Sequence, residues 1–486
     1  MGNGARAVVK IAVLAALGRL LTPEEFGVVA AAGVIVWLSM IFSSLGVGPA
    51  LVQRRTLEPR HISTAFATSV FFGISVALLV FLLAPVIAEL FRIDRLTPVL
   101  RAMAMVFPIA GLSSVGECLL QRRLHFRAIA GAELASYAVG YGVVGIGLAL
   151  TGFGVWSLVG AELTKVTVKS GLFLYLVPDS KQIGFERAAF AELIRFGGRY
   201  AAGGFSTYLA AQGDNFIVAR VLGASALGFY GRAYELMMVP AQALGVVLDK
   251  ILFATMSQMQ DESLRLTRAY RRAAALVALL VLPVSAATIV LAPEIIRALL
   301  GAGWEGAVRP LQVLGAAMYF RSAAMVGSTM ANASGAVGST ATRTAVYAVS
   351  VVIGAWIGSR WGIPGVAAGV VAAVILNFLI VFHLVHRITG LSIREFVMVH
   401  VPALALTAVV GAEAYGVRAL IGGAGAPGVL VLAVFALLAG VTSILLVRLL
   451  PRTALGDEGA WMVGMVCANA PAPVRPFLRR ALAVPA

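Results

Sequence analysis

The chain has 486 residues, of which 60% are hydrophobic and only 12% are charged. Soluble proteins of this size alternate apolar stripes with charged faces, whereas this chain holds many uncharged runs longer than the roughly 20 residues that cross a bilayer. The residue-by-residue alternation of a membrane β-barrel is absent. Composition therefore excludes a soluble protein and predicts an all-α, polytopic membrane protein.

Apolar runs separated by polar turns predict about fourteen transmembrane helices. Each run is read as one crossing, because a helix satisfies its own backbone hydrogen bonds inside lipid. In chain order, the helices are expected at residues 5–21, 26–45, 63–90, 99–119, 128–150, 154–176, 196–220, 229–252, 273–300, 308–330, 344–360, 363–385, 397–419 and 427–448.

The formal net charge of +16 would suit a nucleic-acid partner, but the positions of the basic residues indicate a different role. With a cytoplasmic N-terminus, most Lys and Arg residues fall in loops on the inner side, for example Arg122, Arg123 and Arg127. Excess positive charge marks the cytoplasmic side of a membrane protein. The pattern predicts two cytoplasmic termini, an even number of crossings and contact with anionic membrane lipids, and no nucleic acid is expected.

Two segments about 200 residues apart share a pattern. Residues 19–27 (RLLTPEEFG) end the first predicted helix and open the second, and residues 220–228 (RVLGASALG) do the same for the seventh and eighth. Residues 152–155 (GFGV) and 362–366 (GIPGV) form a second match at a similar offset. Six crossings return the chain to the same side, so the matches predict two parallel six-helix lobes that rock to give alternating access.

The repeat also defines the expected domain organisation. In the segment between the lobes, Phe185, Phe190 and Leu193 indicate an amphipathic helix on the inner membrane face. The expected domains are an N-terminal lobe at 1–176, this cytoplasmic linker at 177–195, a second lobe at 196–385, an additional helix pair at 386–450 and a cytoplasmic tail at 451–486.

Three basic residues, Lys165, Lys169 and Arg321, fall deep inside predicted helices. A charge at mid-bilayer is costly and normally marks a substrate or ion path. We expect these cations to line one water-filled cavity between the lobes and to bind an anion such as a diphosphate, which Arg and Lys both bind well. Glu162 shares the helical arc of Lys165 and Lys169. An alternative is therefore that Glu162 merely locks Lys165 internally, and Glu162 also counts among the candidate coupling or gate residues.

A second charged group is predicted where the seventh and eighth helices meet. Asp214, Arg232 and Glu235 either couple proton or sodium movement to the rocking of the lobes, or form a structural ion-pair network. Arg19 and Arg220 lie at the outer ends of matched helices. They are either parts of a gate or interfacial side chains that reach the lipid headgroups.

The sequence contains no motif that indicates catalysis or a resident metal or cofactor. There is no P-loop and no His/Cys spacing of a metal site. A membrane-embedded enzyme of polysaccharide assembly, the enzymatic alternative, would be expected to carry a sizeable extramembrane loop with catalytic carboxylates. Every predicted loop is short, so we expect a protein without enzymatic chemistry.

Several of these segments resemble Wzx-type polysaccharide flippases, the polysaccharide-transporter branch of the MOP superfamily. Residues 19–27 are similar to the junction between the first two helices of that family. The similarity covers the first twelve predicted helices, and the last two only by hydropathy. Further matching segments are residues 45–54 (LGVGPALVQR), 123–127 (RLHFR), 152–157 (GFGVWS), 214–220 (DNFIVAR), 230–234 (YGRAY) and Pro240.

The resemblance implies a V-shaped, MATE-like pair of lobes and a function. Such flippases move undecaprenyl-diphosphate-linked oligosaccharides across the bacterial inner membrane for exopolysaccharide, capsule or O-antigen synthesis, and a polysaccharide polymerase and export machinery are the implied partners. The alternative within this superfamily is a MATE-type cation or drug/proton antiporter. That protein would expose acidic and aromatic side chains to its cavity, whereas the mid-depth charge counted in this sequence is mainly positive.

Overall fold

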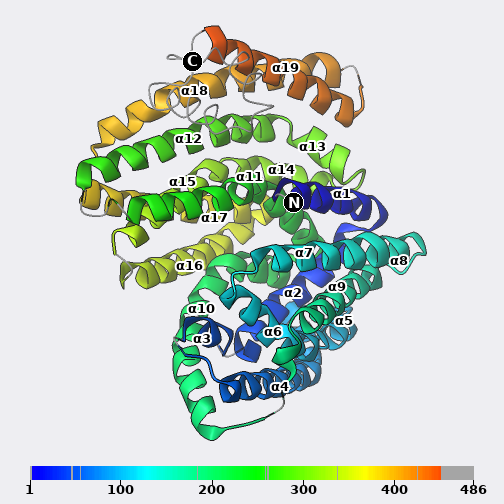
Figure 1. Cartoon of the computed structure of the whole chain (residues 1–486). Helices are drawn as coiled ribbons and strands as arrows, with labels where there is room; N and C mark the ends of the chain where they lie inside the picture. Colours follow the sequence, from blue (N-terminus) through cyan, green and yellow to red (C-terminus); the bar gives the residue numbers. More distant parts are fainter. Residues whose placement is uncertain are drawn as a thin grey trace. The chain divides into compact units, whose positions relative to one another are not determined.

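The computed structural model describes residues 3–44, 47–54, 56–182, 184–257, 259, 262–335, 338–423 and 425–449. The predicted cytoplasmic tail at 451–486 lies outside the described residues. Within these ranges the chain forms helices joined by short turns, and they contain no β-strand (Figure 1). The prediction of an all-α fold is confirmed.

Each of the predicted helices coincides with a helical segment of the structure, although several segments are broken into shorter helices. The helices are α1 (Asn3–Leu20), α2 (Pro23–Ser44), α3 (Val47–Gln53), α4 (Pro59–Phe91), α5 (Leu96–Met103), α6 (Val106–Arg122), α7 (Phe126–Tyr137), η1 (Ala138–Gly145), α8 (Ile146–Leu150), α9 (Val155–Leu176), η2 (Pro178–Lys181), α10 (Arg187–Leu222), α11 (Ala224–Ser257), α12 (Ser263–Val290), α13 (Ala292–Leu299), η3 (Glu305–Ala307), α14 (Val308–Gly315), α15 (Ala317–Ala333), α16 (Gly338–Gly358), η4 (Ser359–Trp361), α17 (Gly362–Thr389), α18 (Ile393–Val417), η5 (Arg418–Gly422) and α19 (Gly428–Leu449).

Among the described residues, 8 helical segments are long and apolar enough to cross a membrane. One of them, Thr342–Thr389, holds both α16 and α17 with the short η4 turn between them. Helix α9 is outside this group and carries Glu162, Lys165 and Lys169. The chain is therefore a multi-pass membrane protein, and the number of fourteen crossings stays a prediction.

The chain folds into two compact units. The first unit contains residues 1–231 with the short returns 299–303 and 351–363, and the second contains the remainder. Helix α10 joins the end of the predicted linker to the seventh predicted helix without a break, and it packs on α2, α3 and α4. The predicted linker at 177–195 and the predicted second lobe at 196–385 divide α10 between them, whereas the whole helix belongs to the first compact unit. The bounds of the predicted lobes stay a prediction.

In the first unit, α9 packs against α6 and the π-helix η1. Because π-helical turns are wide and rare, they occur mostly as short insertions, often at functional sites. Gly140 in η1 lies directly on α9, and a Cβ there would be 2.6 Å from the Ala161 carbonyl oxygen and 2.8 Å from Lys165 Cβ. The absence of a side chain at Gly140 thus sets how closely η1 approaches the lysine.

In the second unit, α18 lies along α12, and α14 and α15 also pack on α12 (Figure 1). Polar contacts of His400 and Arg418 join α18 and η5 to the rest of this unit. Buried His400 pairs through Nε2 with the hydroxyl group of Tyr319 in α15. Arg418 donates to the Val290 carbonyl oxygen at 3.0 Å and lies 3.2 Å from Glu294 Oε1.

The two copies of the repeated sequence pattern contact each other inside the first unit. Helix α2 begins with a capping box, in which Thr22 and Glu25 exchange backbone and side-chain hydrogen bonds. A Cβ on Gly27 would lie 1.7 Å from the Ala224 carbonyl oxygen, and a Cβ on Gly228 would lie 1.9 Å from the Pro23 carbonyl oxygen. These are equivalent positions of the two copies, so the contact is reciprocal, as a local two-fold rotation generates.

We predict that Gly27→Ala destabilises the protein by about 1–3 kcal/mol, because the new methyl group would force the starts of α2 and α11 apart. Thermal unfolding in detergent measures the effect. Gly33→Ala is the matched control in α2, since a Cβ there meets nothing within 4 Å. Equal melting temperatures for the Gly27 and Gly33 variants would contradict the close contact.

Candidate functional site: a lysine pocket in the first unit

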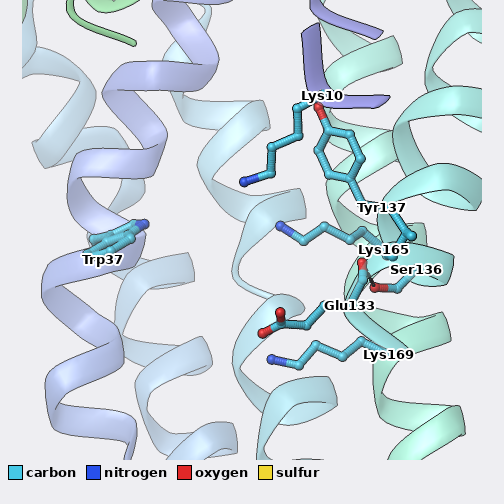
Figure 2. A pocket seen from close by; sticks show the side chains of 8 residues that line it. Lys10, Trp37, Glu133, Ser136, Tyr137, Lys165 and Lys169 are labelled. Atoms are coloured by element: carbon cyan, nitrogen blue, oxygen red, sulfur yellow. Dashed lines mark hydrogen bonds between the residues drawn. The ribbon is translucent and has the colours of Figure 1, made fainter. Parts of the chain in front are cut away.

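A pocket of about 440 Å³ opens between helices of the first unit, and we call it the lysine pocket. Figure 2 shows the amino groups of Lys10, Lys165 and Lys169 pointing into one space, together with the carboxylate of Glu133 and opposite the ring of Trp37. Its lining residues come from α1, α2, α7 and α9, and they are Lys10, Trp37, Glu133, Leu134, Ser136, Tyr137, Lys165 and Lys169.

Lys165 is held by a carboxylate and an aromatic ring. Its Nζ atom donates to both Oε1 and Oε2 of Glu162, each at 2.7 Å. The hydroxyl group of Tyr141, which lies on η1, donates to the same carboxylate at 2.8 Å. The Lys165 Nζ atom also lies 5.8 Å from the centre of the Tyr141 ring, within the range of a cation–π contact.

Lys169, one helical turn further along α9, has a different partner. Its Nζ atom lies 2.9 Å from Glu117 Oε2 on α6 and 5.3 Å from the centre of the Phe173 ring. The register of the two helices is fixed by Ser113 and Ser170, whose hydroxyl groups are 2.8 Å apart. Sequence analysis missed Glu117, because only the packing of α6 on α9 brings it to the lysine.

The third lysine, Lys10, approaches the pocket from α1. Its Nζ atom lies 6.0 Å from the centre of the Tyr137 ring. Tyr137 in turn stacks on Tyr141, with ring centres 5.0 Å apart. The aromatic pair therefore forms a continuous wall beside Lys10 and Lys165, and the sequence analysis had not connected these tyrosines with the lysines.

Positive and negative charges balance around the lysine pocket. Three lysines share this region with Glu133, Glu162 and Glu117. The internal pair of Glu162 with Lys165, given above as the alternative, is present. An anionic ligand must therefore compete with carboxylates for these lysines.

Arg321, the third predicted cavity cation, lies on α15 of the second unit. Its Nη1 atom donates to the hydroxyl group of Tyr347 at 3.2 Å, and its guanidinium group lies 5.6 Å from the centre of the Tyr234 ring. The prediction that Arg321 shares one cavity with Lys165 and Lys169 stays a prediction.

The predicted coupling residues make polar contacts within each of the two units. Asp214, which is 2% exposed, accepts a hydrogen bond of 2.6 Å from the hydroxyl group of Tyr230 in the first unit. Arg232 and Glu235 of the second unit form an ion pair of 2.6 Å. A role in ion coupling stays a prediction for all three predicted residues.

The two predicted gate residues occupy equivalent places in the structure. Arg19 lies in the last turn of α1, and Arg220 lies in the last turn of α10. Each arginine is the first residue of one copy of the repeated pattern, at residues 19–27 and 220–228. Their function at a gate stays a prediction.

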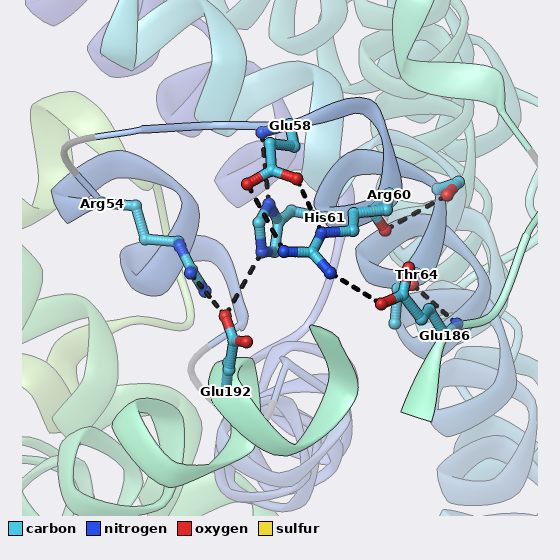
Figure 3. Close-up of polar contacts among 8 residues, drawn as sticks. Arg54, Glu58, Arg60, His61, Thr64, Glu186 and Glu192 are labelled. Atoms are coloured by element: carbon cyan, nitrogen blue, oxygen red, sulfur yellow. Dashed lines mark hydrogen bonds and ion pairs between the residues drawn. The ribbon is translucent and has the colours of Figure 1, made fainter. Parts of the chain in front are cut away.

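A second polar network, which sequence analysis did not predict, holds the start of α10 to the start of α4 (Figure 3). Arg54 contacts Glu192 at 2.5 Å, and Arg60 contacts Glu186 at 2.8 Å. The fully buried His61 lies 3.4 Å from the same Glu192 carboxylate. The hydrogen bond from Arg54 keeps the pKa of Glu192 below its ordinary value of 4.5.

Comparison with known families gives one match that covers more than half of the chain. The model of a family described as polysaccharide biosynthesis proteins matches residues 16–309.

Curated relatives with similar sequences are named as biosynthesis proteins. The lipopolysaccharide biosynthesis protein WzxC of Escherichia coli is 24% identical over 79% of this chain and 78% of its own length. The teichuronic acid biosynthesis protein TuaB of Bacillus subtilis is 24% identical over 63% of this chain and 64% of its length. The succinoglycan biosynthesis transport protein ExoT of Rhizobium meliloti is 27% identical over 61% of this chain and 60% of its own length. The chain thus spans less than two thirds of TuaB and ExoT.

Solved structures share the fold at low sequence identity. The lipid II flippase MurJ, in an inward closed conformation, matches with a TM-score of 0.70 and 14% identity, over 89% of this chain and 98% of that chain. A multidrug resistance MATE family transporter of the MOP superfamily matches with a TM-score of 0.63 and 18% identity, over 79% of this chain and 95% of that chain. The predicted MOP-type fold is confirmed.

We predict that Lys169 and Glu117 are energetically coupled. In a double-mutant cycle with Lys169→Met and Glu117→Gln, the two losses of unfolding free energy should fail to add by about 0.5–3 kcal/mol, because each single change leaves a partly buried polar partner unpaired. Unfolding in detergent measures the four proteins. Additive losses would contradict the ion pair.

We predict that Glu192→Gln removes a pH-dependent part of the stability. Because the pKa of Glu192 is lower in the folded protein, its interaction contributes fully above the ordinary pKa of 4.5 and is lost as the pH falls through the lowered pKa. Glu192 lies in the predicted linker, outside the predicted membrane helices. The melting temperature of Glu192→Gln should therefore be lower than that of the unmodified protein at neutral pH, and the difference should vanish in acid. A difference that does not change with pH would contradict this assignment.

Proposed function

Because the chain belongs to the family of polysaccharide biosynthesis proteins, we propose that it is a flippase for lipid-linked oligosaccharides. The family match, together with a lysine pocket built from helices of a multi-pass membrane protein, carries this proposal. WzxC, TuaB and ExoT are named for the biosynthesis of lipopolysaccharide, teichuronic acid and succinoglycan, and the name of ExoT includes transport. The fold shared with MurJ and MATE transporters agrees with a carrier.

The proposed substrate is an oligosaccharide joined to an undecaprenyl diphosphate carrier. Lys165 and Lys169 offer compact positive charges to the diphosphate oxygens, and Lys10 adds a third amino group at the same pocket. Arg321 is proposed to take part through a bidentate contact. Trp37 and Tyr137 supply apolar faces with polar edges, which suit the sugar rings.

The proposed setting is the bacterial inner membrane, with both termini in the cytoplasm. The excess of Lys and Arg in the inner loops supports this orientation. Alternating access between two parallel repeats would carry the headgroup across, with H⁺ or Na⁺ as the coupling ion. A polysaccharide polymerase and export machinery are proposed to receive the product. No enzymatic step is proposed.

The charges at the lysine pocket do not distinguish a flippase from a cation or drug/proton antiporter. Glu133, Trp37 and Tyr137 are the kind of acidic and aromatic residues that a cation carrier would expose. The sequence argument from excess positive charge therefore no longer separates the two functions. The family match and the named relatives favour the flippase, and we place more weight on them.

We predict that Lys165→Ala and Arg321→Ala each slow flipping by about 10- to 100-fold, because each change removes a charge-assisted contact to the diphosphate. Arg321→Lys should be milder but still defective, since it keeps the charge and loses the planar fork. Transport of a lipid-linked oligosaccharide in reconstituted vesicles measures the rate.

Lys181→Ala is the control, because Lys181 is an exposed lysine in η2, within the predicted linker at 177–195. It should transport at the normal rate. Thermal stability is measured beside transport in every variant. Normal flipping in Lys165→Ala, or loss of flipping only together with the fold, would contradict the proposed site.

A further inference from the structure

We propose that Glu162 and Glu117 are proton-binding sites, so that an anion bound in the lysine pocket is accompanied by protons taken up on these two carboxylates. The proposal rests on the proposed function, in which a lipid diphosphate occupies this pocket. It goes beyond that function by naming the co-bound cation and the atoms that take it.

Before a ligand binds, each of the two lysines of α9 is paired with a glutamate. Lys165 donates to both carboxylate oxygens of Glu162 at 2.7 Å, and Lys169 lies 2.9 Å from Glu117. A diphosphate diester carries two negative charges. When the two lysines turn to its oxygens, each glutamate exchanges a neighbouring ammonium group for a neighbouring phosphate.

This exchange increases the affinity of the carboxylates for protons. Loss of a positive neighbour and gain of a negative one both favour the neutral form of an acid. An unpaired charge among membrane helices is costly as well, and protonation removes it. The hydroxyl group of Tyr141 donates a hydrogen bond to Glu162 but brings no charge to balance it. Anion binding and protonation therefore favour each other.

The remaining lysine of the pocket, Lys10, does not make up the difference, because the three lysines already face Glu117, Glu133 and Glu162 and the ligand adds two negative charges. Arg101 lies over the Phe81 ring, 4.9 Å from its centre, and Arg122 donates to the carbonyl oxygens of Leu51 and Val52. The ionisable groups on α9, on the described side chains of α1 and on the elements packed against α9 are Lys10, Arg19, Glu24, Glu25, Arg101, Glu117, Cys118, Arg122, Arg127, Glu133, Tyr137, Tyr141, Glu162, Lys165, Lys169, Tyr175, Asp179 and Lys181. Helix α4, which packs on α6, adds Arg60, His61 and Glu89.

The geometry favours a proton over a metal cation. Hard metal cations need several oxygen ligands at once. Among the described residues, no group of three or more His, Cys, Asp or Glu side chains is arranged so that it could hold a metal ion. Glu162 and Glu117 pair with different lysines and act as separate carboxylates. Each of them can accept one proton from solvent as its lysine leaves.

The test is calorimetric binding of farnesyl-diphosphate-linked N-acetylglucosamine to the full chain in detergent. Titrations at one pH in two buffers of different ionisation enthalpy give the number of protons taken up per molecule bound. The phosphates of this diester keep their charge near neutral pH, so the protons come to the protein. We expect net proton uptake, and an affinity that falls by up to about tenfold per pH unit for each coupled proton as the pH rises.

Glu162→Gln keeps the shape of the side chain but cannot take a proton. It should still bind the probe, take up fewer protons and show a weaker dependence of affinity on pH. Glu162→Gln/Glu117→Gln should take up fewer still, and any uptake that remains belongs to Glu133, the third carboxylate at the pocket. The matched control is Glu262→Gln, because Glu262 also pairs with a basic residue three positions later, Arg265 at 3.0 Å, away from the pocket. It should behave like the unmodified protein.

The outcomes separate the two proposals. If the unmodified protein binds the probe without proton uptake while Lys165→Ala loses binding, the proton sites are wrong and the proposed function stands. If Glu235→Gln, or added Na⁺, changes the proton count and Glu162→Gln does not, the proton sites are also wrong. If the unmodified protein fails to bind, or Lys165→Ala binds as well as it does, both proposals fail. Should the double variant not fold, the proton count of the unmodified protein still decides.

Discussion

A charged side chain among membrane helices must be balanced by a partner, and this constraint organises the first unit. Lys165 and Lys169 of α9 each lie within hydrogen-bond distance of a glutamate. Their carboxylate partners come from α9 itself and from α6, so the helices must pack in one register for both pairs to form. A ligand that takes the lysines disturbs this balance. Ligand binding in the pocket is therefore coupled to any process that restores the balance of charge.

Close backbone packing makes those pairs possible. Gly140 lets the π-helix η1 lie against α9 at Lys165, and η1 carries the Tyr141 hydroxyl group that contacts Glu162. Gly27 and Gly228 bring the starts of α2 and α11 together through reciprocal contacts. Small residues at helix interfaces are a general means of association inside lipid, where apolar burial gives little driving force. Here they position the polar groups of the site.

Much of the fold was predictable, because membrane helices are long apolar runs. The helix positions and the all-α class follow from hydropathy, and the MOP-type fold was implied by the family resemblance of segments such as residues 19–27. Within one helix, the arc shared by Glu162 and Lys165 was also predictable from helical spacing. Glu117 and Tyr141 were not, because their contacts depend on how separate helices pack. The network of Arg54 with Glu192 was missed for the same reason.

The most direct measurement of the central claim is a structure of the full chain with farnesyl-diphosphate-linked N-acetylglucosamine bound. The account predicts phosphate oxygens within hydrogen-bond distance of Lys165 Nζ and Lys169 Nζ, with the bonds from these lysines to Glu162 and Glu117 broken. A structure in which both ion pairs persist and the diphosphate lies elsewhere would contradict it.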